Sequence, residues 1–354
     1  MKKIVSLFMA LALSASLLAG CGTAASSGSA SAASSAASSA ASSVASSAAS
    51  VPAAERTAFR IAGLKGPTTM GMVELMQSAE DGKARHDYAV TMYGTPDEIV
   101  PKIVSGELDV AAVPTNLASV LYNKTKGAVQ MVAVNTLGVL YVVENGDTVK
   151  SLADLKGKTV YTTGKGANPE YVLNYLLREN GLDPEKDLTV EYKSEATEVA
   201  AALQTAGAGA VAMLPQPYVT VVAQKMPELR VALDMTQEWN KVNPDSGLVS
   251  GVLVARRDFI AEHEAAFAEF LEDYKNSTMY VNENVEAASE LVAKYGIIEK
   301  APLAAKAIPQ CNITYLDGKE MKAAASGYLK VLFDQDAKSV GGALPGDDFY
   351  YGAE

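Results

Sequence analysis

The stretch Val110-Ala111-Ala112-Val113-Pro114 returns 101 residues later as Val211-Ala212-Met213-Leu214-Pro215. Each copy is a short, continuous apolar run that ends in proline, and a lysine follows ten residues after each proline. Continuous apolar runs of this length are typical of strands that are buried on both faces of a sheet. The two copies therefore predict two central strands in similar surroundings.

Further matches occur in the same order around this pair. Lys65-Gly66 corresponds to Lys165-Gly166 at an offset of 100 residues, and Tyr93 corresponds to Tyr192 at an offset of 99. Chance is the alternative, because any protein of alternating strands and helices repeats apolar segments. The common order favours two lobes with the same topology.

Both series alternate short apolar segments with helical ones, which predicts an α/β fold whose lobes are mainly parallel sheets flanked by helices. The expected strands are 59–64, 88–92, 109–113 and 129–135 in the first series and 159–162, 188–192, 211–214 and 230–233 in the second. The helices are expected near Met70, Asp97 and Asn116, and after Asn168, Ala196 and Gln216.

Two apolar segments with an internal glycine are expected to connect the lobes: 134–143 with Gly138, and 248–255 with Gly251. Side by side they would form a hinge, with glycine where the backbone dihedral angles must change. We expect residues 58–140 and 250–354 to form lobe 1 and residues 141–249 to form lobe 2. The amphipathic stretches 264–276, 283–294 and 320–333 predict helices that pack onto the lobes as a scaffold.

The first 20 residues have the features of an export signal. Lys2 and Lys3 precede an uncharged run from Ile4 to Gly20, which is short for a membrane span. The run ends Leu17-Leu18-Ala19-Gly20 before Cys21, which is similar to the signal of a bacterial lipoprotein; a plain secretory signal is the alternative. That similarity implies that Cys21 is acylated and anchors the protein to the membrane.

A low-complexity segment follows the cysteine. Of the 32 residues from Thr23 to Ala54, 27 are Ala or Ser, and none is charged or aromatic. Such a segment cannot bury enough apolar surface to form a core. Residues 21–57 are therefore predicted to be a tether.

The composition argues against several classes of function. The 354 residues carry 30 Lys and Arg against 41 Asp and Glu, a net charge of −11, and removal of the signal leaves −13. Nucleic-acid binding requires a basic surface, so none is expected. With two His and two Cys, metal sites and His-dependent nucleophiles are disfavoured, and we expect no metal and no cofactor.

Common enzyme motifs are also missing from the sequence. There is no Gly-x-Ser-x-Gly elbow, no Walker loop, no His-Glu-x-x-His and no Cys-x-x-Cys. His86 and His263 lie in a polar connector and on a helix flank, and Cys311 has no evident His partner. We therefore expect Cys311 to be a buried, inert thiol and the protein not to be an enzyme.

Four turns between a strand and a helix carry the candidate binding residues. In open α/β sheets, ligands bind beyond the carboxyl ends of the strands, where helix N-termini present free N–H groups. Ordinary capping of the helices is the alternative for any single turn. The candidate ligand-binding residues are Lys65, Gly66, Pro67, Thr68, Thr69, Thr115, Asn116, Gly138, Gly164, Lys165, Gly166, Asn168, Gln216 and Trp239.

Two of these residue types suit particular ligands. Lys65 and Lys165 hold equivalent positions, and if both point inward they would suit a carboxylate, sulfonate or phosphate group; solvated lysines are the alternative. Trp239, the only tryptophan, could stack on a planar ligand, and packing in the core is the alternative.

Three phrases resemble those of ABC-importer solute-binding lipoproteins of the nitrate, sulfonate and taurine type, a group that also contains binders of the thiamine pyrimidine precursor. They are Gly-Glu-Leu-Asp-Val-Ala at 106–111, Asp-Leu-Lys-Gly-Lys at 154–158 and Leu-Pro-Gln-Pro at 214–217. The longer phrase at 151–158 is shared by many type II binding proteins, so it is specific for the fold and weak for the ligand.

The resemblance implies a two-lobe type II periplasmic-binding-protein fold whose loops after the first and third strands of each lobe line a cleft. It implies a monomer on the outer face of the cytoplasmic membrane, which captures a small polar ligand, anionic or heteroaromatic, and delivers it to the permease and ATPase subunits. No arginine occupies these loops, which departs from the arginine clamp of some sulfonate binders.

Three alternatives remain. A sensor lipoprotein could use the same binding domain. An enzyme of thiamine-pyrimidine or menaquinone synthesis could use the same fold, but it is disfavoured by the export signal and the few histidines. A purely structural lipoprotein would have no use for the paired turns.

Overall fold

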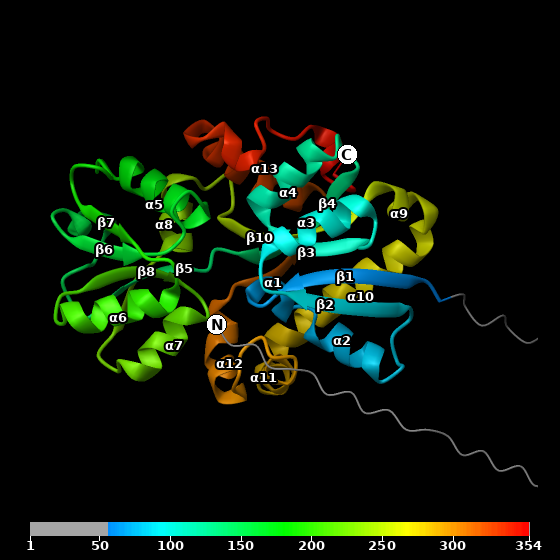
Figure 1. Ribbon diagram of the computed structural model, residues 1–354, viewed down its shortest axis with the longest axis horizontal. Coiled ribbons are helices and arrows are strands. Elements are labelled where there is room, and N and C mark those ends of the chain that lie inside the picture. The colour runs from blue at the N-terminus through cyan, green and yellow to red at the C-terminus, as the bar shows by residue number, and fades with distance from the viewer. Residues whose placement is uncertain (1–55, 354) are drawn as a thin grey trace, which may run out of the picture. The chain divides into compact units, whose positions relative to one another are not determined.

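The computed structural model describes residues 56–353, which fold into two β-sheets flanked by helices (Figure 1). The predicted Cys21 anchor, the signal and most of the tether lie outside these residues. In spatial order, the first sheet consists of β11 (Ile313–Leu316), β4 (Val129–Leu137), β10 (Val249–Arg256), β3 (Val110–Pro114), β1 (Ala58–Leu64) and β2 (Asp87–Tyr93). The second consists of β7 (Thr189–Tyr192), β6 (Thr159–Thr162), β8 (Val211–Pro215), β5 (Leu140–Glu144) and β9 (Arg230–Asp234).

The two sheets repeat one topology. The order β4-β10-β3-β1-β2 of the first sheet is matched by β9-β5-β8-β6-β7 in the second. In both, the first strand pairs in parallel with the second and third, in like register: Ile61 lies opposite Val110, and Val160 opposite Val211. Each sheet therefore keeps a parallel core, and the predicted duplication is confirmed.

One inner strand of each sheet runs against the parallel strands beside it. β10 runs antiparallel to β3 and β4, and β5 runs antiparallel to β8 and β9. β3 and β8 are buried over their first four residues because helices cover both faces, which explains their uninterrupted apolar sequence.

The crossing between the sheets is short. β4 ends at Leu137 and β5 begins at Leu140, so only Gly138 and Val139 separate them. The carboxyl end of β4 thus lies next to the amino end of β5, which itself borders the carboxyl ends of β8 and β9. The carboxyl edges of the two parallel cores consequently face each other across the crossing (Figure 1).

Helices of the strand-helix repeat follow the strands as predicted. They are α1 (Pro67–Met70), α2 (Val73–Glu80), α3 (Pro96–Ser105) and α4 (Thr115–Lys124) in the first series and α5 (Asn168–Glu179), α6 (Ala196–Ala206) and α7 (Tyr218–Lys225) in the second. The helix that follows β9 was not predicted: α8 (Met235–Val242), which contains Trp239.

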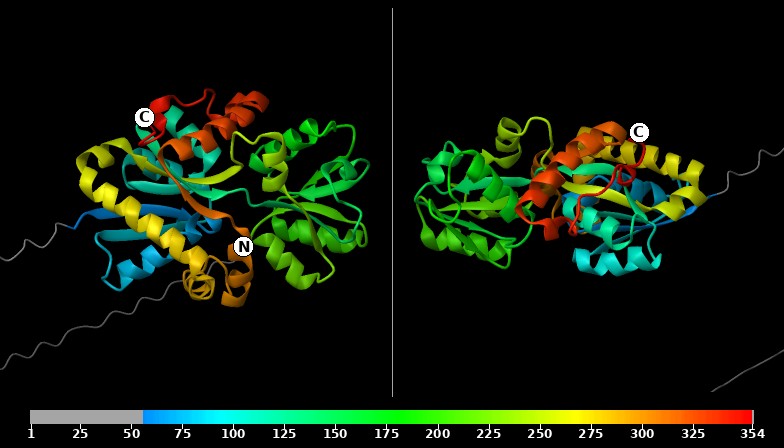
Figure 2. Two further views of the ribbon diagram at one scale, coloured as in Figure 1. Left: turned by 180° about the vertical axis from the view of Figure 1, so that it is seen from behind. Right: turned by 90° about the horizontal axis from the view of Figure 1, so that it is seen from above.

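The C-terminal third adds α9 (Arg257–Glu262), α10 (Glu264–Glu283), α11 (Val285–Lys294), α12 (Ala301–Ala307) and α13 (Gly318–Gln335). α10 runs across one face of the first sheet (Figure 2), where Phe267, Phe270 and Tyr274 share a core with Phe59 and Val110. α12 contacts α7, and α13 contacts α5. These helices therefore reach the second sheet's helices on both sides of the crossing. Over residues 56–353, no helix combines the length and apolar character needed to span a membrane.

Candidate functional site

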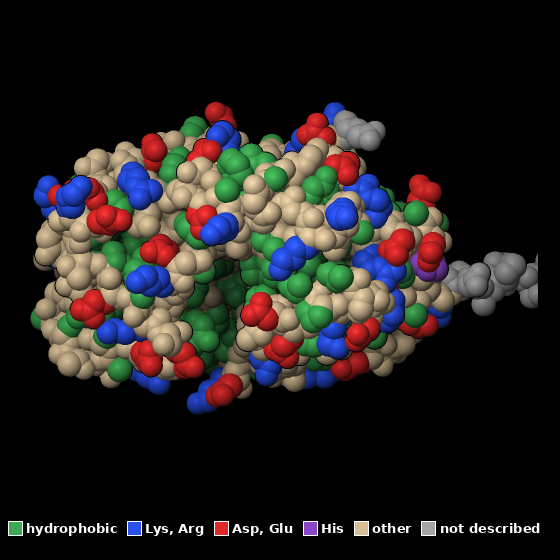
Figure 3. Space-filling model, turned by 45° about the horizontal axis from the view of Figure 1, so that its top comes forward, with side chains coloured by type: hydrophobic (Ala, Val, Ile, Leu, Met, Phe, Trp, Pro, Cys, Tyr) green, Lys and Arg blue, Asp and Glu red, His purple; other side chains and the backbone are tan. Residues whose placement is uncertain are grey.

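A furrow separates the two halves of the molecule where the carboxyl edges of the sheets face each other (Figure 3). Hydrophobic side chains lie on its walls, and basic side chains lie near its mouth. The loops that follow β1, β3, β6 and β8 start at these edges, so the structure brings the four predicted turns to the same side of each sheet.

The β1–α1 turn presents one exposed lysine and buries a neighbouring threonine. Lys65 is exposed and makes no ion pair with any residue in 56–353. The Oγ1 of Thr69 donates a hydrogen bond to the carbonyl of Leu64 at 2.5 Å. Thr69 is fully buried, so its hydroxyl closes the turn, and the prediction that its side chain contacts a ligand is wrong for this structure.

Three glycines allow threonines to approach the base of the furrow. A Cβ on Gly63 would lie 2.5 Å from the Oγ1 of Thr69, and a Cβ on Gly251 would lie 2.4 Å from the Cγ2 of Thr68. A Cβ on Gly138 would lie 2.1 Å from the Oγ1 of Thr236 in α8. None of the three needs a left-handed backbone. The predicted hinge glycines thus serve close packing rather than unusual dihedral angles.

The β3–α4 turn is tied to the return strand. Thr115 is fully buried, and its Oγ1 donates to the carbonyl of Val249 at 2.8 Å. Asn116 is partly exposed, and its Nδ2 donates to the carbonyl of Ser339 at 3.3 Å. The hydroxyl of Thr115 therefore holds β10 in place. The backbone N–H of Thr115 at the start of α4 and the side chain of Asn116 stay candidate ligand contacts.

The β6–α5 turn is the most open of the four. Lys165 is exposed, with its Nζ 5.8 Å from the ring centroid of Tyr192. The N–H of Gly166 donates to the Oε2 of Glu170 at 2.5 Å, so this carboxylate organises the turn itself. The Oδ1 of Asn168 is buried and has no hydrogen-bond partner in the described part of the chain. An unpaired buried acceptor is costly, so this oxygen would be stabilised by any donor that reaches it.

The phenol of Tyr192, next to Lys165, stays neutral. Burial and the nearby Glu170 carboxylate raise the pKa of Tyr192 well above its ordinary value. A neutral phenol can still donate a hydrogen bond. The proton of Tyr192 is thus retained beside the Glu170 carboxylate.

The β8–α7 turn is fixed by Gln216, of which only 2% is exposed. Its Oε1 accepts from the Oγ1 of Thr220 at 2.9 Å, and its Nε2 donates to the Oε1 of Gln310 at 2.7 Å. Its backbone N–H donates to the carbonyl of Val139 at 2.8 Å. Gln216 thus spans the crossing.

Three of the helices that start at the four turns lack side-chain caps. No capping side chain bonds to the first turn of α1, α4 or α5, whereas α3 begins with a capping box of Thr95 and Glu98. The first turn of α7 is the exception, because the N–H of Thr220 donates to the Oε1 of Gln216 at 3.3 Å. Uncapped first turns leave backbone N–H groups and the positive end of the helix dipole available to an anion.

Residues 70–305 match the family described as ABC transporter, phosphonate, periplasmic substrate-binding protein. The chain belongs to this family. No curated protein sequence matches it.

Solved structures of other substrate-binding proteins share the fold. An ABC transporter protein from Parabacteroides distasonis superposes with a TM-score of 0.68 at 22% identity over 83% of this chain and 98% of that one. The periplasmic aliphatic sulphonate binding protein SsuA from Escherichia coli gives 0.65 at 18% identity over 83% and 96%. The periplasmic nitrate-binding protein NrtA from Synechocystis PCC 6803 gives 0.51 at 14% identity over 73% and 69%.

The predicted stacking role of Trp239 in this substrate-binding protein is wrong. Trp239 is fully buried, and its Nε1–H donates to the carbonyl and the Oγ of Ser246, both at 3.2 Å. Its ring packs 4.8 Å from the ring of Tyr175 and 5.5 Å from that of Tyr328. The residue is a core contact between α8 and α13.

Two further edge residues were missed. Asn135 at the end of β4 donates from its Nδ2 to the carbonyl of Thr68 at 3.2 Å. Its counterpart 101 residues later is Thr236, whose Oγ1 is buried without a partner among residues 56–353. The offset that aligned the central strands would have identified both.

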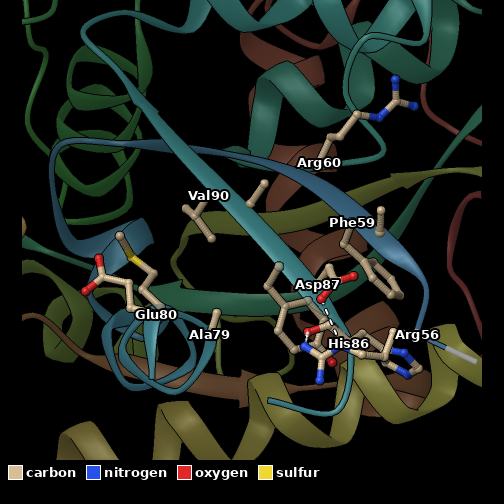
Figure 4. A pocket seen from close by; sticks show the side chains of 12 residues that line it. Arg56, Phe59, Arg60, Ala79, Glu80, His86, Asp87 and Val90 are labelled. Atoms are coloured by element: carbon tan, nitrogen blue, oxygen red, sulfur yellow. Dashed lines mark hydrogen bonds and ion pairs between the residues drawn. The ribbon is translucent and has the colours of Figure 1, made fainter. Parts of the chain in front are cut away.

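A cavity lies elsewhere in this substrate-binding protein, at the amino ends of β1 and β2 (Figure 4). Its volume is about 420 Å³, and Arg56, Phe59, Glu80 and His86 are among the residues that line it. Arg56 donates to Asp87 and to the carbonyl of His86, so its charge is already paired. The furrow, not this cavity, follows the strand-end rule for ligand sites.

Cys311 is buried, as predicted, and burial raises its pKa to about 12. A thiol with so high a pKa is unreactive at neutral pH. Within residues 56–353, no three His, Cys, Asp or Glu side chains cluster in a way that could hold a metal ion.

Proposed function

We propose that this substrate-binding protein captures a small anion with a phosphonate- or sulfonate-like head group in the furrow between its sheets. One observation carries the proposal: the carboxyl edges of both parallel cores face the furrow, and each contributes uncapped helix N-termini and an exposed lysine. Backbone N–H groups at helix N-termini and lysine ammonium groups are general anion ligands.

The source of the positive charge limits the geometry of binding. The four turns contain no arginine, so none of their side chains can make a bidentate guanidinium contact with the ligand. Lys65, in a turn of the first sheet, and Lys165, in a turn of the second, would each supply a positive point charge. The free backbone N–H groups would supply the directional hydrogen bonds that orient the anion. The family description names phosphonate, and two of the structural neighbours are named for sulphonate and nitrate.

Binding would act by closure. A ligand that contacts both edges stabilises the arrangement in which they are near each other, and the permease of an ABC importer would recognise that arrangement. We further propose that Cys21 carries the lipid that holds the protein at the outer face of the cytoplasmic membrane.

The anchor can be tested separately from binding. Cys21→Ser is expected to move the protein from the membrane pellet to the soluble extracellular or periplasmic fraction, because the acylated sulfur is removed. Mass spectrometry of the N-terminal peptide provides the second readout. A variant that still pellets with the membrane, or an unmodified Cys21 in the native protein, would reject the anchor.

Replacement of Lys165 tests the binding proposal. Lys165→Met keeps the length of the side chain but removes the charge, so the dissociation constant for methylphosphonate or methanesulfonate should rise about tenfold to hundredfold, as for a lost charge-assisted hydrogen bond. Isothermal titration of the full chain in detergent measures it. Lys225→Met is the matched control, because Lys225 is also exposed and lies at the end of α7.

Two outcomes count against the proposal in different ways. If the wild type binds neither probe nor nitrate, the proposed ligand class is wrong. If it binds one of them and Lys165→Met binds as tightly as Lys225→Met, the role of Lys165 is wrong and the ligand class stands.

A further inference from the structure

A three-residue connector contacts the crossing between the sheets on both sides of Gly138. It consists of Gln310, Cys311 and Asn312, between α12 and β11. None of the furrow turns includes it, and it is far from them in sequence. Its hydrogen bonds nevertheless reach both halves of the molecule.

On the side of the first sheet, Asn312 holds the end of β4. The N–H of Leu137 donates to the carbonyl of Asn312 at 3.0 Å, and the Nδ2 of Asn312 donates to the carbonyl of Gly138 at 2.5 Å. Asn312 has a φ of 45°, a left-handed conformation that asparagine tolerates better than most residues. Asn312 makes its bonds to Leu137 and Gly138 from this left-handed conformation.

On the side of the second sheet, Gln310 holds β5 and the β8–α7 turn. Its carbonyl accepts from the hydroxyl of Tyr141 at 2.8 Å, and its Oε1 accepts from the Nε2 of Gln216 at 2.7 Å. The buried Cys311 side chain between them packs in a core with α11 and α12 residues such as Val292 and Leu303. The connector is thus anchored in the C-terminal helices and bonded to both sides of the crossing.

We propose that Gln310, Cys311 and Asn312 form a hinge clasp that sets how readily the two halves separate. Asn312 fixes the crossing to the first sheet, and the bonds of Gln310 to the second sheet are the ones that must break or turn when the halves move apart. Gln310 is a positioning residue, because it acts on the furrow through Gln216. The effect of the hinge clasp on ligand affinity rests on the proposed function, but the existence of the clasp does not.

Hydrogen–deuterium exchange of the full chain in detergent, without ligand, tests the clasp. Gln310→Ala removes the bond that holds the Gln216 side chain. The backbone N–H of Gln216, which donates to the carbonyl of Val139, should then open more often and exchange about two- to tenfold faster, while peptides of α2 and α10 stay unchanged. Gln310→Glu keeps the acceptor for Gln216 and should exchange like the wild type. Gln204→Ala, at an exposed position of α6, is the matched control.

A second variant tests the other side of the clasp. Asn312→Gly accepts the left-handed backbone but removes the side-chain bond to Gly138. The carbonyl of residue 312, which accepts from the N–H of Leu137, is then held less firmly, so the amide of Leu137 should exchange faster. Uniform acceleration throughout the chain would indicate general destabilisation and overturn the proposal, as would unchanged exchange at Gln216 and Leu137. The methylphosphonate dissociation constant is measured in parallel; loss of the clasp with no binding by any variant would reject the proposed function alone.

Discussion

Gly138→Ala is expected to lower the free energy of unfolding by about 3 kcal/mol, the upper end of the usual cost of overpacking a core. A Cβ at this position would lie 2.1 Å from the Oγ1 of Thr236 and 2.6 Å from the Cδ2 of Leu248. Thr236 lies in α8 and Leu248 directly precedes β10, so both side chains would have to shift where these segments meet the crossing. Urea unfolding of the full chain measures the loss.

Two further variants make this prediction specific. Gly94→Ala is the control, because its Cβ would meet only the end of the flexible Glu98 side chain, at 3.3 Å. Gly138→Ala combined with Thr236→Ala should recover part of the loss, because the nearest clash is removed. Equal midpoints for Gly138→Ala and Gly94→Ala would show that the crossing has room for a side chain and would contradict the close-packed hinge.

Glu144→Gln is expected to cost about 3 kcal/mol of stability, because it removes the buried carboxylate partner of the half-buried Arg230 and of two backbone donors. The carboxylate is fully buried at the end of β5 and accepts from the Nη2 of Arg230 at 2.7 Å. It also accepts from the backbone N–H of Thr148 and of Val149, each at 3.0 Å. A glutamine would turn an amide donor toward at least one of these donors.

The same carboxylate predicts a dependence of stability on pH. Burial acts to raise its pKa, but the hydrogen bonds from Thr148, Val149 and Arg230 outweigh burial and lower the pKa from 4.5 to about 2. A carboxylate with a lowered folded-state pKa contributes stability that is complete above the unfolded value and is lost as the pH falls from 4.5 toward 2. The contribution amounts to about 3 kcal/mol.

The difference between the wild type and Glu144→Gln isolates this contribution, since other carboxylates titrate in both proteins. The urea midpoints of the two proteins should differ at pH 7 and lie closer together at pH 3. A difference that stays constant over this range would show that Glu144 does not titrate as the structure implies.

Most strands of both sheets were predictable because the same order of apolar and helical segments occurs twice in the sequence. β1, β3 and β8 lie within one residue of the expected bounds. α8 was missed, although Met235, Trp239 and Val242 have the spacing of one helix face. β11 was also missed, because a four-residue edge strand is defined by its pairing with β4, which local sequence does not encode.

The site was predictable as a set of turns but not as a set of exposed side chains. Thr115 donates to Val249, 134 residues away in sequence, and this partner decides that its hydroxyl serves the fold. Trp239 was placed beside the furrow because its helix had not been recognised. The connector of the hinge clasp carries no motif, so only the tertiary structure reveals its bonds to both halves.

A crystal structure grown with methylphosphonate tests the central claim most directly. We expect electron density for the anion in the furrow, with phosphonate oxygens within hydrogen-bonding distance of backbone N–H groups from the turn at 65–69 and from the turn at 164–168. Density confined to one of the two turns, or found instead in the cavity beside Arg56, would contradict capture between the two sheets.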